Sequence, residues 1–241
     1  MAFLDVLDRY ALSVSEIIYV DVPYRLPTSL DREREKFGYD RFFNIREHPY
    51  YKATTVLGRP PITVTASDIN SPNIRTAIES LSSRYVLFTG GGIVSPETLN
   101  LGKHLVHIHP GALPERRGST CFYYSLLEDN LLESSSFLMS QKLDSGRVLV
   151  AKKFKPNFRV MGFQGGFMEH ILDCLLRAEL LPETIRLLES NSFESEYHAP
   201  KIDVKGSLYF QIHPVLRGIA ANKLEEIYDP KKTEGLEECV Y

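Results

Sequence analysis

The stretch that most constrains the fold is residues 104–118, where a short apolar run is stopped by a proline and a glycine. Pro110 and Gly111 turn the backbone, which predicts a strand over 104–109. Side chains alternate between the two faces of a strand, so His107 and His109 point the same way. In open α/β sheets, ligands bind just beyond the carboxyl ends of strands. The two histidines are therefore expected at a functional site.

Strand-like and helix-like segments alternate on both sides of this stretch. The sequence predicts, in order, a helix over 1–12, a strand over 16–21, a strand over 62–65, a helix over 72–82, a strand over 85–89, a helix over 96–101 and a helix over 119–130. Residues 22–60 are rich in charge, aromatic rings and proline, and they predict a surface excursion with one short helix. This alternation is typical of an α/β fold.

The second half of the chain predicts a different arrangement. Strands over 135–140 and 147–152 flank a turn with Asp144 at its tip, as in an antiparallel pair. The remaining predicted elements are helices over 162–181, 183–189 and 215–226, a strand over 207–212 and a charged, frayed C-terminal tail.

Composition excludes several classes of protein. The net charge of −3 argues against general nucleic-acid binding, which leaves a basic footprint. No apolar run approaches the roughly 20 residues that span a bilayer. The sequence shows no secretory signal. The three scattered cysteines suggest free thiols in a reducing compartment, so a cytoplasmic protein with no nucleic-acid or membrane partner is expected.

The histidines of this stretch also suit a metal site. His104, His107 and His109 form an H-x2-H-x-H pattern, and His-x-His can place two ligands on one metal ion. A zinc site still needs a third ligand, and His104 lies on the other face of the strand. We therefore expect no metal, and keep a zinc hydrolase as the less favoured alternative.

Three motifs occur in order at the spacing typical of one enzyme family. They are His109-Pro-Gly-Ala-Leu-Pro114, Arg117-Gly118 and Leu143-Asp-Ser-Gly146. Together they resemble the formyltransferases that use 10-formyltetrahydrofolate, whose motifs are Asn-x-His-Pro-Ser-x-Leu-Pro, Arg-Gly, and Asp-Thr-Gly or Asp-Ala-Gly. The similarity covers roughly residues 62–150, and His107 stands where the family has asparagine.

The resemblance implies a Rossmann-like, open, twisted and mostly parallel sheet, the formyltransferase fold, with a small C-terminal α+β extension. The catalytic core is then expected over 1–155 and the extension over 156–241. The family also has an earlier strand and a glycine-containing turn ahead of the first helix, which these 241 residues lack. Either the true start lies upstream, or the sheet is built without that strand.

The resemblance assigns catalysis to His109 and Asp144, with His107 in the place of the asparagine. In formyl transfer an amine attacks the formyl carbon through a tetrahedral species with a negative oxygen, which a protonated imidazole stabilises. A carboxylate keeps that imidazole charged and collects the proton that the amine loses. His107 is expected to supply an N–H or a second positive charge.

The resemblance also implies the residues that hold the two substrates. The loop after the strand 85–89 is expected to wrap the pterin ring, because its three glycines let a flat ligand approach the backbone. The expected folate-binding residues are Phe88, Thr89, Gly90, Gly91, Gly92, Ile93, Val94, Leu113, Gln141 and Leu143. The expected acceptor-binding residues are Pro110, Gly111, Arg117, Gly118 and Ser119.

Length separates the branches of this family. The methionyl-tRNA enzymes are longer, the glycinamide ribonucleotide enzymes are shorter, and the formyltetrahydrofolate hydrolases carry a regulatory domain ahead of the motifs. The remaining branch formylates an amine on a nucleotide-linked sugar for surface glycans, including pseudaminic-type acids. We therefore expect 10-formyltetrahydrofolate as co-substrate and an amino sugar as acceptor, and leave a homodimer open. The alternatives are hydrolysis of the formyl donor, or a non-catalytic protein that binds folate or a sugar nucleotide.

Overall fold

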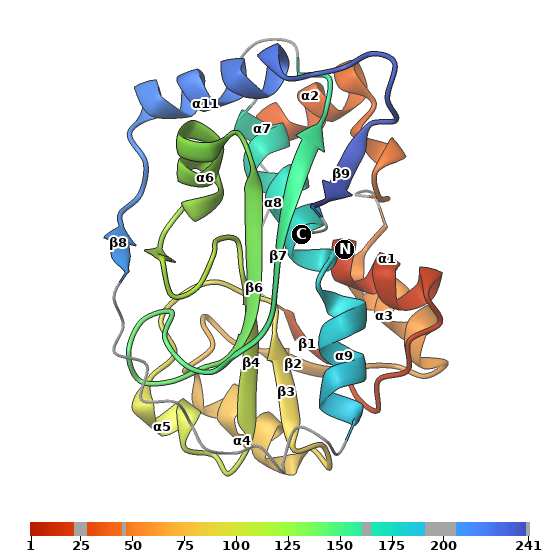
Figure 1. The fold of residues 1–241 in the computed structure, drawn as a ribbon. Coiled ribbons are helices and arrows are strands. Elements are labelled where there is room, and N and C mark those ends of the chain that lie inside the picture. Colours follow the sequence, from red (N-terminus) through yellow and green to blue (C-terminus); the bar gives the residue numbers. More distant parts are fainter. Residues whose placement is uncertain (22–27, 45–46, 161–164, 191–205, 240–241) are drawn as a thin grey trace.

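The central sheet of the computed structural model has five strands in the order β3-β4-β6-β7-β9 (Figure 1). The structure describes residues 1–21, 28–44, 47–160, 165–190 and 206–239. The strands of this sheet are β3 (Tyr85–Phe88), β4 (His104–His109), β6 (Leu132–Leu138), β7 (Val148–Asn157) and β9 (Gly235–Glu238). β3 and β4 run parallel, whereas β6, β7 and β9 each add antiparallel to the strand before them.

Two short parallel pairs accompany the central sheet. β1 (Ile18–Asp21) pairs with β2 (Ile62–Thr65), and β5 (Arg116–Gly118) pairs with β8 (Ser207–Tyr209). Among the antiparallel pairs of the described residues, β6 and β7 are consecutive strands, whereas β4 pairs with β6 and β7 with β9 across intervening elements. The α/β class and the antiparallel pair around the Asp144 turn are confirmed.

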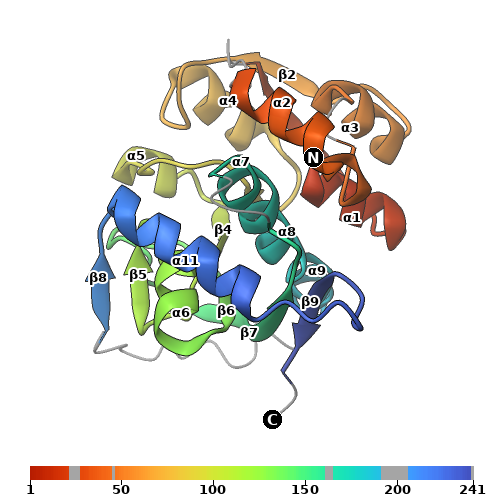
Figure 2. The same ribbon diagram turned by 90° about the horizontal axis from the view of Figure 1, so that it is seen from above.

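Helices cover the sheet. They are α1 (Ala2–Arg9), α2 (Thr28–Phe37), α3 (Pro49–Leu57), α4 (Pro72–Ser80), α5 (Pro96–Leu99), α6 (Cys121–Asp129), α7 (Gly165–Phe167), α8 (Asp173–Ala178), α9 (Leu181–Glu189) and α11 (Pro214–Glu226), with a 3-10 turn η1 (Tyr39–Arg41) and a π-helical turn η2 (Met168–Leu172). α6 and α8 both pack on β6, and α9 packs on β7. Figure 2 shows α11 lying across α6.

Helix starts follow a common local rule. Proline suits the first helical position, because its fixed φ is helical and its missing N–H would be unpaired there anyway. In α3 and α11 the preceding histidine caps the helix, since its Nδ1 accepts the N–H of Tyr50 and of Val215, respectively. In α5 the hydroxyl of Ser95 accepts the N–H of Thr98 instead. The helix start predicted at Ser71-Pro72 is also confirmed.

The core lies where α6, η2 and α8 meet the sheet. Its fully buried members include Ile108 of β4, Leu126 of α6, Phe154 of β7, Met168 of η2 and Leu176 of α8. Every residue of β6 is buried, although the strand reads Leu-Glu-Ser-Ser-Ser-Phe-Leu. Buried polar side chains need partners. Those partners belong to the site described below.

Three sequence-based predictions of the fold need correction. Within the described residues 28–44 and 47–60, the segment predicted to hold one short helix has two helices and a 3-10 turn. The prediction of a charged, frayed C-terminal tail is wrong in part, because residues 235–238 form β9 on the edge of the central sheet. The predicted helix over 162–181 is divided into α7, η2 and α8, and its residues 162–164 lie outside the described part.

Two global expectations concern membranes and thiols. None of the described helices combines the length and the apolar character that a bilayer crossing requires. Cys121, Cys174 and Cys239 are free thiols, as their scattered positions predict.

Candidate active site

His109, the last residue of β4, lies 3% exposed at the carboxyl end of its strand. Its Nε2 lies 2.9 Å from the main-chain oxygen of Arg116. A carbonyl oxygen only accepts, so this nitrogen carries the hydrogen and donates it. Its Nδ1 lies 3.7 Å from Oδ2 of Asp144. The geometry therefore brings together the two residues that the motifs assigned to catalysis.

Asp144 is placed by the turn between β6 and β7. Its φ of +42° is left-handed, a conformation that aspartate adopts more readily than most residues. Gly146 follows with a φ of +145°, and a Cβ there would lie 1.9 Å from the oxygen of Leu138. The hydroxyl of Ser145 closes the turn by donating to the oxygen of Lys142 at 2.8 Å. The Asp-Ser-Gly motif thus consists of residues that this turn needs.

One short strand holds both members of the pair. Arg116 of β5 accepts from His109 through its main-chain oxygen, and the N–H of Gly118 donates to Oδ2 of Asp144 at 2.8 Å. The spacing of two residues along β5 therefore sets the spacing between imidazole and carboxylate. β8 in turn fixes β5, since the N–H of Ser119 donates to the oxygen of Tyr209 at 2.9 Å.

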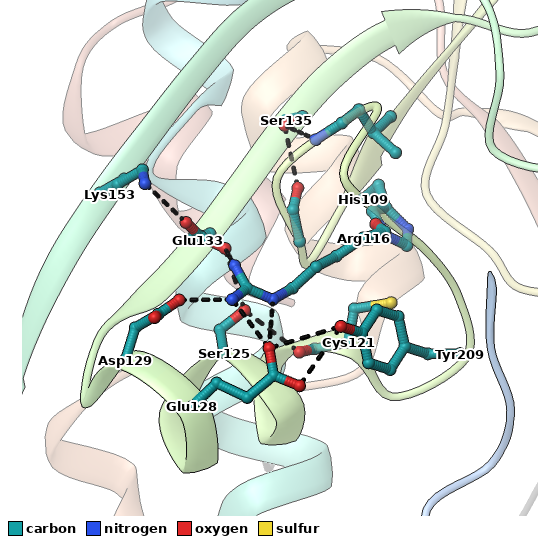
Figure 3. Close-up of polar contacts among 12 residues, drawn as sticks. His109, Arg116, Cys121, Ser125, Glu128, Asp129, Glu133, Ser135, Lys153 and Tyr209 are labelled. Carbon is teal, nitrogen blue, oxygen red and sulfur yellow. Dashed lines mark hydrogen bonds and ion pairs between the residues drawn. The ribbon is translucent and has the colours of Figure 1, made fainter. Parts of the chain in front are cut away.

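The buried serines of β6 hold the turn that follows His109. The hydroxyl of Ser134 donates to the main-chain oxygen of His109 at 3.0 Å. The hydroxyl of Ser135 donates to the oxygen of Gly111 at 2.9 Å and accepts the N–H of Leu113 at 3.0 Å (Figure 3). Gly111 leaves room for this arrangement, because a Cβ there would lie 2.9 Å from Nε2 of His109.

Burial decides the protonation of His109. Burial lowers the pKa of His109, and the charge of Asp144 and the hydrogen bond to Arg116 only partly oppose that effect. Asp173 and Arg177 of α8 also act on its charge, with opposite signs. The imidazole is therefore neutral at neutral pH, with Nδ1 unprotonated beside a carboxylate. This differs from the charged imidazole that the motifs imply, because a buried neutral His109 becomes charged only on accepting a proton.

His107 differs from what the motif comparison suggested. Burial lowers its pKa to about 4, so it supplies no positive charge at neutral pH. Its Nδ1 lies 2.7 Å from the main-chain oxygen of Phe88, which fixes the hydrogen on that nitrogen. Nε2 is then a hydrogen-bond acceptor. The N–H that His107 was expected to supply is therefore already bound to the oxygen of Phe88, at the end of β3. The expected second positive charge is absent at neutral pH.

This low pKa predicts a loss of stability in acid. A histidine that titrates near 6.5 when unfolded and at about 4 when folded binds a proton in the unfolded chain first. Stability is therefore complete above pH 6.5 and falls as the pH drops towards 4. In urea unfolding, His107→Asn should reduce the difference in unfolding free energy between pH 7 and pH 4.5 by roughly 2 kcal/mol.

A matched control for this measurement is His213→Asn. His213 is an exposed helix cap, and asparagine also caps helices well, so this variant should keep the helix and change the pH dependence far less than His107→Asn does. Equal pH dependence in His107→Asn and the wild type would contradict the burial of a neutral His107.

The expected folate-binding residues divide into an exposed and a buried group. Thr89 to Ile93, Gln141 and Leu143 are exposed, whereas Val94 and Leu113 are buried and Phe88 is half-buried. Asn70 pins the glycine-containing loop: its amide donates to the oxygen of Ile93 at 2.8 Å and accepts the N–H of Ser95 at 2.7 Å. The sequence gives no sign of this role, because Asn70 reads as an ordinary turn residue.

The expected acceptor-binding residues lie on the segments next to His109 and Asp144. Pro110 and Gly111 form the turn after His109, and Arg117 and Gly118 lie on β5. Arg117 donates through Nη2 to the oxygen of Gly206 at 3.3 Å. The main-chain N–H groups of Gly118 and Ser119 are already occupied within the protein. Binding of an acceptor by these residues stays a prediction.

The zinc alternative needs at least three ligands that meet at one point. In the part of the chain that the structure describes, no group of three histidine, cysteine, aspartate or glutamate side chains could hold a metal ion. His104 packs its ring against Tyr85, and Nδ1 of His107 is bound to Phe88.

Comparisons with known proteins give the following matches. No protein-family model matches the chain. A methionyl-tRNA formyltransferase from Nitrosomonas eutropha is 33% identical over 89 residues, which are 36% of this chain and 28% of that protein. The chain thus matches less than a third of the length of that relative. This match confirms the resemblance to formyltransferases that the motifs indicated.

Two solved formyltransferase structures were compared with the chain. A phosphoribosylglycinamide formyltransferase from Bacillus halodurans matches with a TM-score of 0.50 and 13% identity, over 79% of this chain and 89% of that chain. A sugar N-formyltransferase from a Shewanella species matches with a TM-score of 0.46 and 15% identity, over 88% of each chain. The match to the Bacillus halodurans enzyme confirms the expected formyltransferase fold.

Proposed function

We propose that this chain is an enzyme that transfers a formyl group from 10-formyltetrahydrofolate to the amine of an amino sugar, carried on a nucleotide, in the synthesis of surface glycans. The observation that carries the proposal is the pair of His109 and Asp144. One short strand orients both groups, and the unprotonated Nδ1 of the imidazole lies 3.7 Å from the carboxylate. Free thiols fit a protein of a reducing compartment such as the cytoplasm.

The residues present fit a flat folate donor. A Cβ on Gly91 or Gly92 would meet nothing within 4 Å, so the backbone of this loop is open to a ring. Ile93 and Leu143, from two separate loops, are 76% and 48% exposed, so both apolar side chains are available to a bound ring. Ile93 lies in the loop after β3, which pairs with β4, and Leu143 directly precedes Asp144. We assign the pterin ring to this surface.

The chemistry needs one group that takes a proton and returns it. When bound, 10-formyltetrahydrofolate supplies an electrophilic formyl carbon. Nδ1 of His109 accepts the proton that the amine loses as its nitrogen bonds to that carbon. The carboxylate of Asp144 stabilises the imidazolium that results. His109 then returns the proton to the folate nitrogen as its bond to the formyl carbon breaks, so the products are a formamide and tetrahydrofolate.

The acceptor is proposed to bind along β8. This strand pairs with β5, so it lies next to the residues that hold the catalytic pair. Phe210, directly after β8, is 75% exposed, and an exposed aromatic ring can stack on a flat base or on a sugar face. The arrangement supports a ring-bearing acceptor beside the site.

Turnover distinguishes transfer from its alternatives. The purified protein is mixed with 10-formyltetrahydrofolate, with and without a panel of nucleotide-linked amino sugars, and tetrahydrofolate formation is followed by absorbance. The expected result is turnover that requires an amino sugar and yields one formamide per tetrahydrofolate. Turnover without an amine would instead indicate a hydrolase. Donor binding without turnover on any acceptor would indicate a non-catalytic relative.

A further inference from the structure

Arg116 lies at the centre of a partly buried cluster of charges that the proposed mechanism does not use (Figure 3). Its guanidinium contacts Glu128 at 2.9 Å through Nη2 and at 3.3 Å through Nε. It also forms ion pairs with Asp129, on the same helix, and with Glu133 of β6. One planar side chain thus ties β5 to both α6 and β6.

Glu133 makes this cluster more than a surface ion pair. Its side chain is 1% exposed, and its second cationic partner is Lys153, at 3.0 Å. The hydroxyl of Ser125 donates to it at 3.2 Å. A buried carboxylate that loses its partner is strongly destabilising, so Glu133 holds the guanidinium firmly in place. Arginine suits such a position, because its fork of donors can bind several carboxylates at once.

The same residue contacts His109 through its main chain. The oxygen of Arg116 accepts from Nε2 of His109, two residues before the N–H that holds Asp144. In Figure 3, Arg116 lies between His109 and the carboxylates of Glu128, Asp129 and Glu133. A shift of the Arg116 main chain would therefore alter the hydrogen bond that orients the imidazole.

We propose that Arg116 is a positioning residue, whose guanidinium is anchored by Glu128, Asp129 and Glu133 so that its carbonyl fixes His109 with Nδ1 towards Asp144. The consequence for catalysis rests on the proposed function, whereas the orientation and tautomer of His109 do not. Arg116 lies between Leu113-Pro114 and Arg117-Gly118 and belongs to none of the three motifs that carry the family resemblance.

The test is Arg116→Lys, which keeps the positive charge and loses the fork. A misplacement of about 1 Å can cost ~100-fold in rate, so kcat should fall by roughly 10- to 100-fold with little change in KM. The matched control is Arg217→Lys, because Arg217 is also largely buried and paired with a carboxylate, Glu169. This control should lose a similar amount of thermal stability and keep its kcat.

Nitrogen NMR of the His109 imidazole gives a readout that needs no activity. In the wild type we expect a single tautomer with the hydrogen on Nε2, and in Arg116→Lys an exchange-averaged pair of signals. The other groups that act on this imidazole, Asp144, Asp173 and Arg177, are unchanged in the variant. If the wild type transfers no formyl group, the proposed function fails while this measurement still decides the positioning role.

A second variant covers the case in which Arg116→Lys does not fold. The double variant Arg116→Met, Glu133→Gln removes the buried carboxylate together with its partner, and should fold with the same altered NMR signals. Wild-type kcat and a single Nε2-protonated tautomer in a folded variant would overturn the proposal. A kcat loss equal to that of Arg217→Lys, with His109 signals unchanged, would also overturn it.

Discussion

Replacing His109 with alanine is expected to lower kcat for formyl transfer by about 10³-fold, because the variant has no group at the reacting carbon that takes and returns a proton. In the wild type, the hydrogen bond from Nε2 to Arg116 orients the ring so that Nδ1 faces Asp144. A water molecule in the space that alanine leaves has no such fixed orientation. The measurement is steady-state formation of tetrahydrofolate with a saturating amino sugar.

The matched control for this variant is His104→Ala. His104 lies on the same strand, β4, but at its opposite end. Its replacement should change kcat by less than about 2-fold, since it contacts neither Asp144 nor Arg116 in the described structure. A zinc hydrolase that uses the H-x2-H-x-H pattern would lose activity in both variants. Equal losses of kcat in His104→Ala and His109→Ala would therefore reject the assignment of proton transfer to His109.

Replacing Asp144 with asparagine is expected to lower kcat by about 10²- to 10³-fold while the fold is retained. Asparagine adopts the left-handed φ of +42° well, and its oxygen can still accept the N–H of Gly118. What is lost is the negative charge that raises the pKa of His109 and stabilises its imidazolium. The acid limb of the pH profile of kcat/KM should therefore move to lower pH.

Asp229→Asn is the control for this experiment. Asp229 is another turn aspartate that accepts a main-chain N–H, from Lys231 at 2.9 Å. Its replacement should leave both kcat and the pH profile unchanged. If Asp144→Asn showed a wild-type profile, the carboxylate would not act on the imidazole, and the mechanism would have to place the proton elsewhere.

The sequence was most informative where local chemistry determines the structure. The strand 104–109 has its predicted ends, because Pro110 and Gly111 can only stop it. The Asp144 turn was found because aspartate and glycine at these positions meet the backbone geometry directly. β9 was missed, since Gly235–Glu238 is short and acidic, and its strand character comes from pairing with the distant β7.

The sequence predicted that His109 and Asp144 lie together, but not their electrostatics. That His109 and Asp144 converge could be inferred from motif order. The neutral state of both histidines could not, because it comes from burial under helices that no motif reports. The role of Arg116 was equally invisible: its three carboxylate partners come from a helix and a strand later in the chain, and no local pattern pairs them with it.

The pairing of β5 with β8 has a consequence for how the protein is made. Arg117 and Gly206, which this pairing brings into contact, are 89 residues apart in the sequence. A ribosome that adds ~5–20 residues per second reaches Gly206 roughly 5–20 s after Arg117. Until then the nascent chain contains His109 and Asp144 but lacks β8, the strand that pairs with β5. A chain that ends before β8 therefore lacks the strand that pairs with β5, and with it the support for the proposed pair of His109 and Asp144.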